Sequence, residues 1–254
     1  MLCDISEEFV SKGAARVQAF LQKGVDKGKT TEQQRDDTLA RISTSTDRAA
    51  ACADADLVVE AVPEDLALKN GIFRELGALV KPSCVLASNT SSLSLAKVFD
   101  GVQGPERCIG WHFFNPVPIM KLLELVRTDA TSDATIAASQ DYGRLLRKEP
   151  ILVKDSPGFA SSRLGVCLGL EAIRMLEAGV ASAEDIDKAM MLGYGHPMGP
   201  LKLTDLVGLD VRLAIADYLR DELGLEGFAA PELMRQMVSD GKLGKKSGQG
   251  FYAW

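Results

Sequence analysis

The stretch that decides the fold is DLVVEAVPEDLALKNGIFRELGALVKPSCVLASNT, residues 56–90. It begins with a short apolar run at 56–62, which is typical of a strand buried on both faces of a parallel sheet. Apolar residues at helical spacing follow at 66–80, and a second apolar run at 84–90 ends in small polar residues. Two buried strands joined by a helix predict an α/β fold with a mostly parallel sheet.

The same alternation continues on both sides of this stretch, and it ends near residue 153. In the first part we expect, in chain order, a helix at 9–27, strands at 107–113 and 121–126, a helix near 132–146 and a short strand at 151–154. In the second part helical patterns dominate, at 160–178, 182–192, 200–206, 211–223 and 231–238. We therefore expect a Rossmann-like, doubly wound domain over 1–153 and a smaller all-α domain over 154–254.

Composition excludes several classes of function. The formal net charge of −6 over 254 residues argues against general affinity for nucleic acid or for an anionic membrane surface. No apolar run approaches the roughly 18 residues that would span a bilayer. The start, MLCDISEEFV, has neither the basic nor the apolar region of a secretory signal, and we expect a cytoplasmic protein.

The cysteines predict neither a metal site nor a disulfide framework. They are scattered along the chain at Cys3, Cys52, Cys84, Cys108 and Cys167. No C-x-x-C pair and no Cys/His cluster occurs, so we expect no bound metal. A catalytic thiol is disfavoured because no cysteine has a histidine neighbour that would lower its pKa. We interpret all five as reduced core thiols.

A histidine and a glutamate lie within apolar runs of IGWHFFNPVPIMKLLEL, residues 109–125. His112 is expected at the end of one strand and Glu124 within the next. If the two strands are neighbours, the imidazole and the carboxylate can pair, which fixes the tautomer and orientation of the ring. Such a histidine can act as a general base. The alternative interpretation is a hydrogen-bonded core histidine beside a glutamate that faces solvent.

These residues also carry a resemblance to a known family. WHFFNPVPIMKLLELV (111–126) is similar to the L-3-hydroxyacyl-CoA dehydrogenases, as are ASNTSSL (87–93), DLVVEAVPEDLALK (56–69), KDSPGF (154–159) and LGYGHPMGPLKLTDLVGLD (192–210). The likeness covers nearly the whole chain and includes the order of the motifs. It implies oxidation of a (3S)-3-hydroxyacyl-CoA to the 3-oxoacyl-CoA with NAD as hydride acceptor, a step of fatty acid β-oxidation.

The resemblance also implies roles for particular residues. His112 would take the hydroxyl proton, Glu124 would hold the imidazolium, and Ser91 would hydrogen-bond the substrate oxygen. Ser91 has an alternative interpretation as the N-cap of a helix beginning near Leu93. The residues implied as NAD contacts are Asp4, Glu64, Lys69, Asn89 and Asn115.

The substrate contacts are less typical of the family. In the family, the segment that follows PGF commonly has an asparagine directly before an arginine. This chain has Ser162 at the matching position. A serine can make one hydrogen bond but not the two-sided contact of an amide. We expect Ser162 to contact substrate weakly. Lys23 and Lys27 share a helix face and are candidates for the CoA phosphates, although charged helix residues are often only solvated surface.

A dinucleotide-binding half normally opens with a strand, a G-x-G-x-x-G loop and a helix. No G-x-G-x-x-G occurs in this sequence, and Asp4 matches the acidic residue that follows the second strand. We therefore expect the first strand, which is central in the sheet, to be absent together with the pyrophosphate cradle. The chain alone is then expected to bind NAD poorly and to be prone to aggregation or partial unfolding.

Two other functions remain open at this point: a dehydrogenase acting on a small hydroxyacid, and a catalytically impaired homologue with a structural or dimerising role. Relatives of the former usually use a lysine base, which the His112 and Glu124 pattern disfavours. The second domain is expected to form a homodimer interface. The apolar residues expected to exceed its own core are Leu164, Val166, Leu168, Leu170, Ile173 and Leu176.

Overall fold

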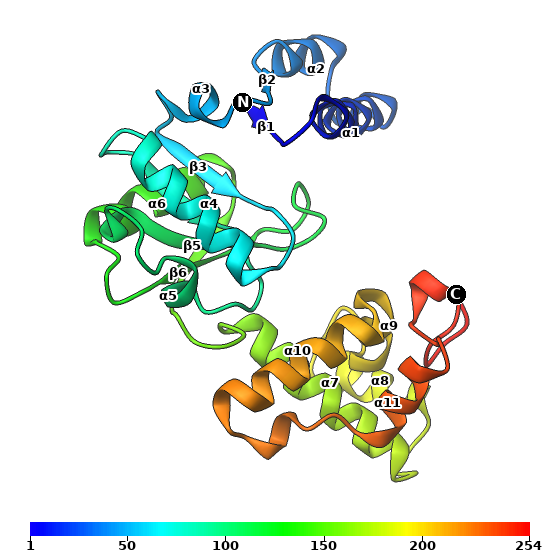
Figure 1. Cartoon of the computed structure of the whole chain (residues 1–254). Helices are drawn as coiled ribbons and strands as arrows, with labels where there is room; N and C mark the ends of the chain where they lie inside the picture. The colour runs from blue at the N-terminus through cyan, green and yellow to red at the C-terminus, as the bar shows by residue number, and fades with distance from the viewer. The chain divides into compact units, whose positions relative to one another are not determined.

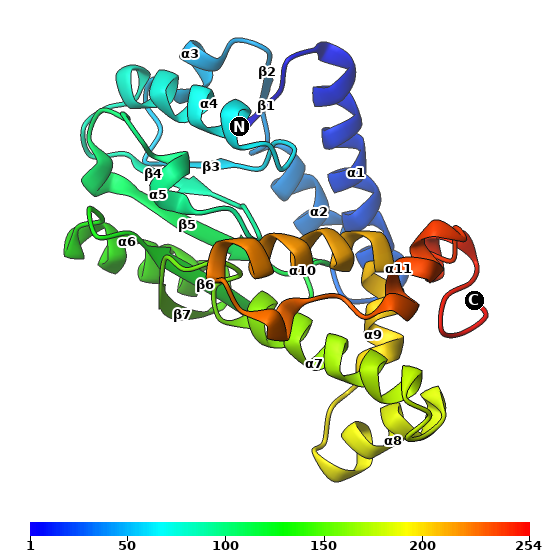
Figure 2. The same ribbon diagram turned by 60° about the horizontal axis from the view of Figure 1, so that its bottom comes forward.

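A computed structural model describes residues 1–254 (Figure 1). The main sheet has five strands in the order β3-β4-β5-β6-β7. Their bounds are β3 (Leu57–Glu60), β4 (Val85–Ser88), β5 (Cys108–Phe113), β6 (Leu122–Arg127) and β7 (Glu149–Lys154). Strands β3, β4 and β5 are parallel, while β6 runs antiparallel to β5. Residues 114–121 between β5 and β6 are too few for the helical crossover that a parallel pair requires. Figure 2 shows the strands following one another across the sheet.

Alternation along the strands divides the sheet into two faces. Side chains of one face, together with helix α6 (Asp133–Leu145), form one of the apolar cores, whose buried members are Val85, Ala87, Ile109, Trp111, Leu123 and Leu125. Because successive side chains of a strand point to opposite faces, Ser88, His112 and Glu124 project from the other face. Helix α4 (Leu66–Leu79) is N-capped by Asp65, whose side chain accepts the Leu68 N–H at 2.8 Å.

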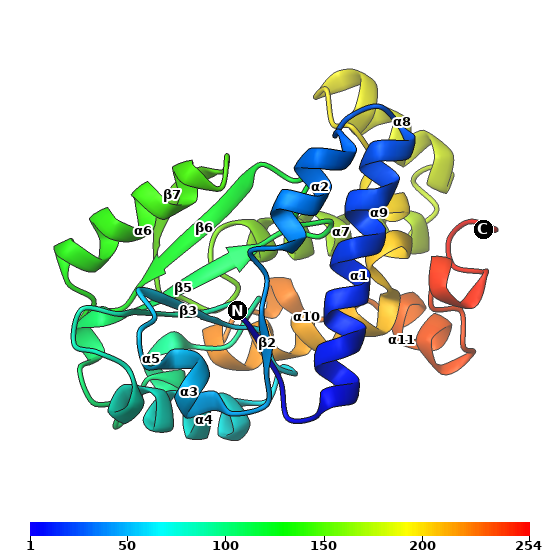
Figure 3. The same cartoon turned by 90° about the horizontal axis from the view of Figure 1, so that it is seen from above.

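The N-terminal segment forms a second, separate sheet. Strands β1 (Leu2–Cys3) and β2 (Thr44–Ser45) pair in parallel, and neither pairs with a strand of the main sheet (Figure 3). The absence of a central first strand stays a prediction. Helix α1 (Glu7–Asp26) packs against α2 (Glu32–Leu39).

Three short elements of this segment were missed by the sequence analysis: α2, β2 and α3 (Arg48–Cys52). Helix α2 has no buried residue, so it lacks the apolar periodicity by which a helix is found. Its local signal is a capping box, in which Thr31 and Gln34 satisfy each other's backbone N–H groups.

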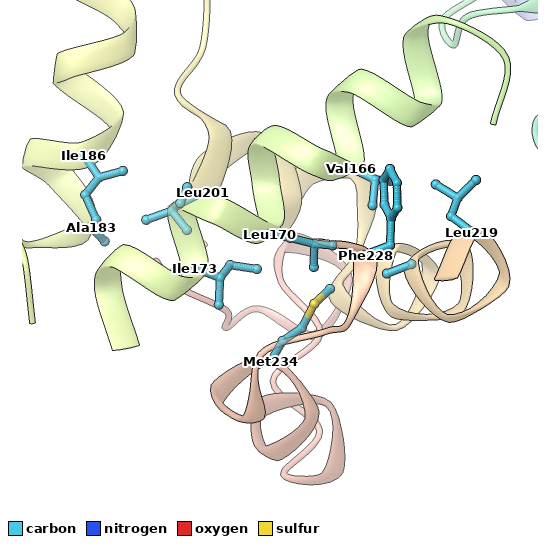
Figure 4. Packing of buried hydrophobic residues seen from close by; sticks show 11 residues of the cluster. Val166, Leu170, Ile173, Ala183, Ile186, Leu201, Leu219, Phe228 and Met234 are labelled. Atoms are coloured by element: carbon cyan, nitrogen blue, oxygen red, sulfur yellow. The ribbon is translucent and has the colours of Figure 1, made fainter. Parts of the chain in front are cut away.

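The second part of the chain is helical, as predicted. Its helices are α7 (Ser161–Glu177), α8 (Ala183–Gly193), α9 (Pro200–Val207), α10 (Leu209–Leu223) and α11 (Glu232–Ser239). Figure 4 shows Val166, Leu170 and Ile173 of α7 pointing into a core that includes Leu201 and Met234. The sequence analysis expected these residues to exceed the core of this unit, which is wrong for these three, because the unit buries them itself. Leu164, by contrast, is exposed.

The C-terminal tail is fixed to this helical core. The carboxylate of Asp205, on α9, accepts the N–H groups of Phe251 and Tyr252 and the indole N–H of Trp254, each at 2.9 Å. The Tyr252 hydroxyl also donates to Asp187 at 2.8 Å. The aromatic tail therefore packs against the helices of this unit.

The chain divides into two units, which we call the sheet unit (Met1–Asn89 and Lys97–Pro150) and the helical unit (Thr90–Ala96 and Ile151–Trp254). The short segment Thr90–Ala96 belongs to the helical unit because Asp155 holds it. Asp155 accepts the N–H groups of Leu95 and Ala96, at 3.1 and 2.8 Å. None of the helices is both long and apolar enough to cross a bilayer.

Candidate active site

His112 and Glu124 meet at the end of the β5–β6 pair. The two residues are direct partners in the strand register, and His112 Nδ1 lies 2.6 Å from Glu124 Oε2. Only 6% of His112 and 0% of Glu124 is exposed. The structure thus contains the contact that the sequence predicted, while the catalytic role of the pair stays a prediction.

The geometry assigns the tautomer of the ring. Because Nδ1 faces a carboxylate, it carries the proton and donates, and Nε2 is the basic atom of the imidazole. The His112 ring also contacts Phe114, with ring centroids 4.6 Å apart. A fully buried carboxylate is costly without a partner, so this pair stabilises an imidazolium if a proton arrives at Nε2.

Asn89 joins the ends of two strands. It follows β4 directly, and its Oδ1 accepts the backbone N–H of Phe113, at the end of β5, at 3.0 Å. The side chain is therefore held one residue from His112 along β5. Asn115 lies two residues beyond β5, exposed, in the turn that begins with the Asn115–Pro116 peptide bond.

A buried ion pair lies beside the end of β3. Lys69 Nζ lies 2.8 Å from Glu60 Oε1 and 3.5 Å from Glu64 Oε2. Lys69 is 1% exposed and Glu60 5%, whereas Glu64 is exposed. The sequence analysis missed Glu60, although its signal was the one that singled out Glu124: a glutamate inside an apolar run. The predicted NAD contacts of Glu64 and Lys69 stay predictions.

The other residues predicted for ligand binding in the sheet unit lie on its surface. Asp4 follows β1, is exposed, and accepts the Ile5 N–H at 2.7 Å. Lys23 and Lys27 lie at the end of α1, exposed and without an ion-pair partner. Because neither ammonium group is held in an ion pair, both are available to bind phosphates.

Ser91 and Ser162 both belong to the helical unit. Ser91 is not the N-cap of the following helix, α5 (Leu95–Val98), which begins later than expected and whose first N–H groups donate to Asp155. Ser162 is the second residue of α7. The assignment of both serines as substrate contacts stays a prediction.

The cysteines are free thiols, but they are not all core residues. Cys52, Cys84 and Cys108 are buried, whereas Cys3 and Cys167 are exposed, which corrects the expectation for these two. Burial raises the pKa of Cys108 from 9.0 to about 12. A thiol of this kind stays protonated near neutral pH and is a poor nucleophile. No group of His, Cys, Asp and Glu residues could hold a metal ion.

The residue types of three predicted NAD contacts suit the ribose and nicotinamide ends of the cofactor, while their contact with NAD stays a prediction. Asp4, Asn89 and Asn115 each lie shortly after a strand of the sheet unit. Ligands of open α/β sheets bind at such strand ends, where a carboxylate suits ribose hydroxyls and an amide suits a carboxamide.

An α/β sheet unit with polar strand ends and a following helical unit is an arrangement of two-domain dehydrogenases. Residues 1–156 match the NAD binding domain of 3-hydroxyacyl-CoA dehydrogenase, and residues 158–254 match its C-terminal domain. The chain therefore belongs to the 3-hydroxyacyl-CoA dehydrogenase family, and its cofactor is NAD.

Individual relatives are similar over nearly the whole chain. The 3-hydroxybutyryl-CoA dehydrogenase of Mycobacterium tuberculosis is 45% identical over 251 residues, which cover 98% of this chain and 87% of the relative. The mitochondrial hydroxyacyl-coenzyme A dehydrogenase of Homo sapiens is 40% identical, with coverage of 100% and 83%. The crystal structure of (S)-3-hydroxybutyryl-CoA dehydrogenase from Ralstonia eutropha has a TM-score of 0.95 at 42% identity, covering 99% of this chain and 89% of that one.

Proposed function

We propose that this protein oxidises a (3S)-3-hydroxyacyl-CoA to the 3-oxoacyl-CoA, with His112 as general base. The observation that carries the proposal is the 2.6 Å contact between His112 Nδ1 and the fully buried Glu124 carboxylate. A buried histidine held by a carboxylate on the adjoining strand has one basic atom, Nε2, in a fixed direction. The names of the relatives support the substrate class.

The reaction moves one proton and one hydride. NAD, when bound, accepts the hydride that leaves C3 of the substrate. His112 Nε2 takes the proton of the 3-hydroxyl group as the C–O bond becomes a carbonyl, and Glu124 stabilises the resulting imidazolium. Ser91 donates a hydrogen bond to the same substrate oxygen. Asn89 and Asn115 would contact the cofactor near its nicotinamide, and Asp4 would contact its adenine ribose.

The substrate's CoA end and the assembly of the protein are further parts of the proposal. Lys23 and Lys27 bind CoA phosphates, and Ser162 contacts the acyl part through a single hydrogen bond. A homodimer forms through the helical unit. Support comes from its exposed apolar side chains, since large uncovered apolar surfaces are typical of interfaces. They include Leu164, Leu192, Tyr194, Leu203, Leu206, Val207 and Val211. A role in β-oxidation and a cytoplasmic location stay predictions, which growth on fatty acids and cell fractionation test.

The test compares substrates and one variant. We expect NADH-dependent reduction of acetoacetyl-CoA with a high KM for NADH, because the sequence has no G-x-G-x-x-G loop to hold the pyrophosphate. We expect little turnover of small keto acids that lack the CoA moiety. Replacing His112 with asparagine removes the base, and we expect turnover to fall by about 10²-fold or more. The matched control is His196→Asn, which changes the other histidine of the chain, located in a loop after α8.

Two outcomes would contradict the proposal. Preferential turnover of a small hydroxyacid would assign the chain to a different class of dehydrogenase. A His112→Asn variant as active as the unaltered chain, or no turnover by either, would favour a structural role.

A further inference from the structure

Glu60 is the centre of a buried polar cluster, which we call the β3–β4 cluster: Glu60, Lys69 and Ser88. Lys69 Nζ donates to Glu60 Oε1 at 2.8 Å and to the Val62 carbonyl at 3.1 Å. The Val62 N–H donates to the same Oε1 at 2.7 Å, and the Ser88 hydroxyl donates to Oε2 at 2.7 Å. Both oxygens of the carboxylate are thus engaged.

Stability alone is a weak reason for such a cluster. Taking two opposite charges out of water costs several kcal/mol per ion, and well-packed apolar residues often replace a buried ion pair without loss. Here the pair is 1–2% exposed at its side chains. A cluster of hydrogen-bonded charged groups fixes the direction of each hydrogen bond, which a cluster of apolar side chains does not do.

Hydrogen bonds connect the β3–β4 cluster with the strand that carries His112. Glu60 and Ser88 are register partners on neighbouring strands, and the Asn89 N–H donates to the Glu60 carbonyl at 2.8 Å. The Asn89 side chain in turn accepts the Phe113 N–H at 3.0 Å. Because Phe113 follows His112, one continuous series of hydrogen bonds and covalent neighbours runs from Lys69 across β3, β4 and β5.

Strand geometry puts the members on a common face. Ser88 pairs with Gly110, and His112 lies two residues further along β5, so their side chains share a face of the sheet. Glu60 shares it as the partner of Ser88. Glu124, the partner of His112 on β6, shares it too. Four adjacent strands therefore contribute one row of buried polar groups.

We propose that Glu60 is a positioning residue for the dehydrogenase site: together with Lys69 and Ser88 it sets the direction of Asn89 and of the end of β5. The inference rests on the proposed function in one respect, the assignment of Asn89 as a cofactor contact. In this arrangement Lys69 acts through Glu60 in addition to its predicted contact with NAD. The Ser88→Ala variant described below leaves Lys69 in place and therefore separates the two roles. The cluster affects the affinity for NAD, while His112 carries out the proton transfer.

The main experiment separates positioning from stability with the double variant Glu60→Gln/Lys69→Met, which removes both charges at once. We expect its melting temperature to stay near that of the unaltered chain, because no unpaired buried charge is left. We expect NAD affinity, measured by calorimetric titration, and KM for NAD to worsen by about tenfold, the effect of losing one hydrogen bond to a charged group. Backbone hydrogen exchange at Asn89 and Phe113 should become faster, while kcat changes less than KM.

A surface pair of the same residue types serves as the control. Lys121 and Glu149 form an exposed ion pair, with side chains 77% and 74% exposed, and Glu149→Gln/Lys121→Met makes the same chemical change there. It should leave melting, exchange and NAD binding unchanged.

Ser88→Ala keeps the proposal testable if the double variant does not fold. It removes one buried hydroxyl and leaves the ion pair in place, and we expect the same direction of change in NAD affinity and in exchange at Phe113. A folded double variant, or a folded Ser88→Ala variant, with unaltered NAD affinity and exchange would overturn the inference. Loss of turnover in these variants with NAD affinity intact would also overturn it. Failure of the His112 variant to lose activity would instead refute the proposed function.

Discussion

Replacing Glu124 by glutamine keeps the shape of a fully buried side chain and removes its charge. An ion pair between an imidazolium and a carboxylate at 2.6 Å is worth about 6 kcal/mol at an effective dielectric constant of about 20. The glutamine amide keeps a dipole toward Nδ1, so we expect about half of this, roughly 3 kcal/mol, to be lost when His112 becomes protonated. Turnover should therefore fall by about 10²-fold.

The assay is the steady-state reduction of acetoacetyl-CoA by NADH, with the unaltered chain and Glu149→Gln as references. Glu149 is exposed in β7 and outside the proposed site, so its replacement should not alter kcat. Circular dichroism establishes that Glu124→Gln is folded. If the folded variant keeps more than about one tenth of the wild-type kcat, the carboxylate does not stabilise the charged ring during proton transfer. The general-base role of His112 would then have to be abandoned.

Four further predictions concern other parts of the chain. Asp205→Ala leaves three tail N–H groups without their acceptor, and thermal melting should report destabilisation by about 3 kcal/mol. Leu192→Glu puts a charge on a side chain that is 84% exposed; light scattering should find monomers if α8 lies in the dimer interface, and an unchanged dimer would exclude α8 from it. Lys23→Ala/Lys27→Ala should raise KM for acetoacetyl-CoA but not for the pantetheine thioester, which lacks the nucleotide phosphates. The pKa of Cys108 is 9.0 in the unfolded chain and is raised to about 12 by burial in the folded chain, so stability should fall as the pH rises above about 9. In denaturant titrations the Cys108→Ala variant should show a smaller fall. An equal fall would exclude this thiol as the cause.

Local patterns in the sequence predicted most of the sheet and of the helical unit. The apolar runs around Glu60 and Ser88 and the helical spacing between them correspond to β3, α4 and β4. These signals are local because a buried strand or an amphipathic helix shows its period within one element. Helix α2 was missed for the same reason, since its residues bury no apolar face.

The pairing of His112 with Glu124 was predictable because only a short turn separates their strands, so the two strands had to be neighbours. Register then decided that the two side chains are direct partners. The resemblance to a family supplied what periodicity could not, namely the reaction and the residues that contact NAD.

Other features depended on tertiary structure alone. Asp155 supplies the N-terminal hydrogen bonds of α5 from about sixty residues away along the chain, and no local pattern marks such a partner. The inward direction of Val166 and Leu170 depended on which neighbouring helices pack against α7. The sequence by itself determined where strands and helices form, because that follows from neighbours along the chain. Only the folded chain decided which buried charges meet, as Glu60 and Lys69 do, because electrostatic pairing depends on distance in space.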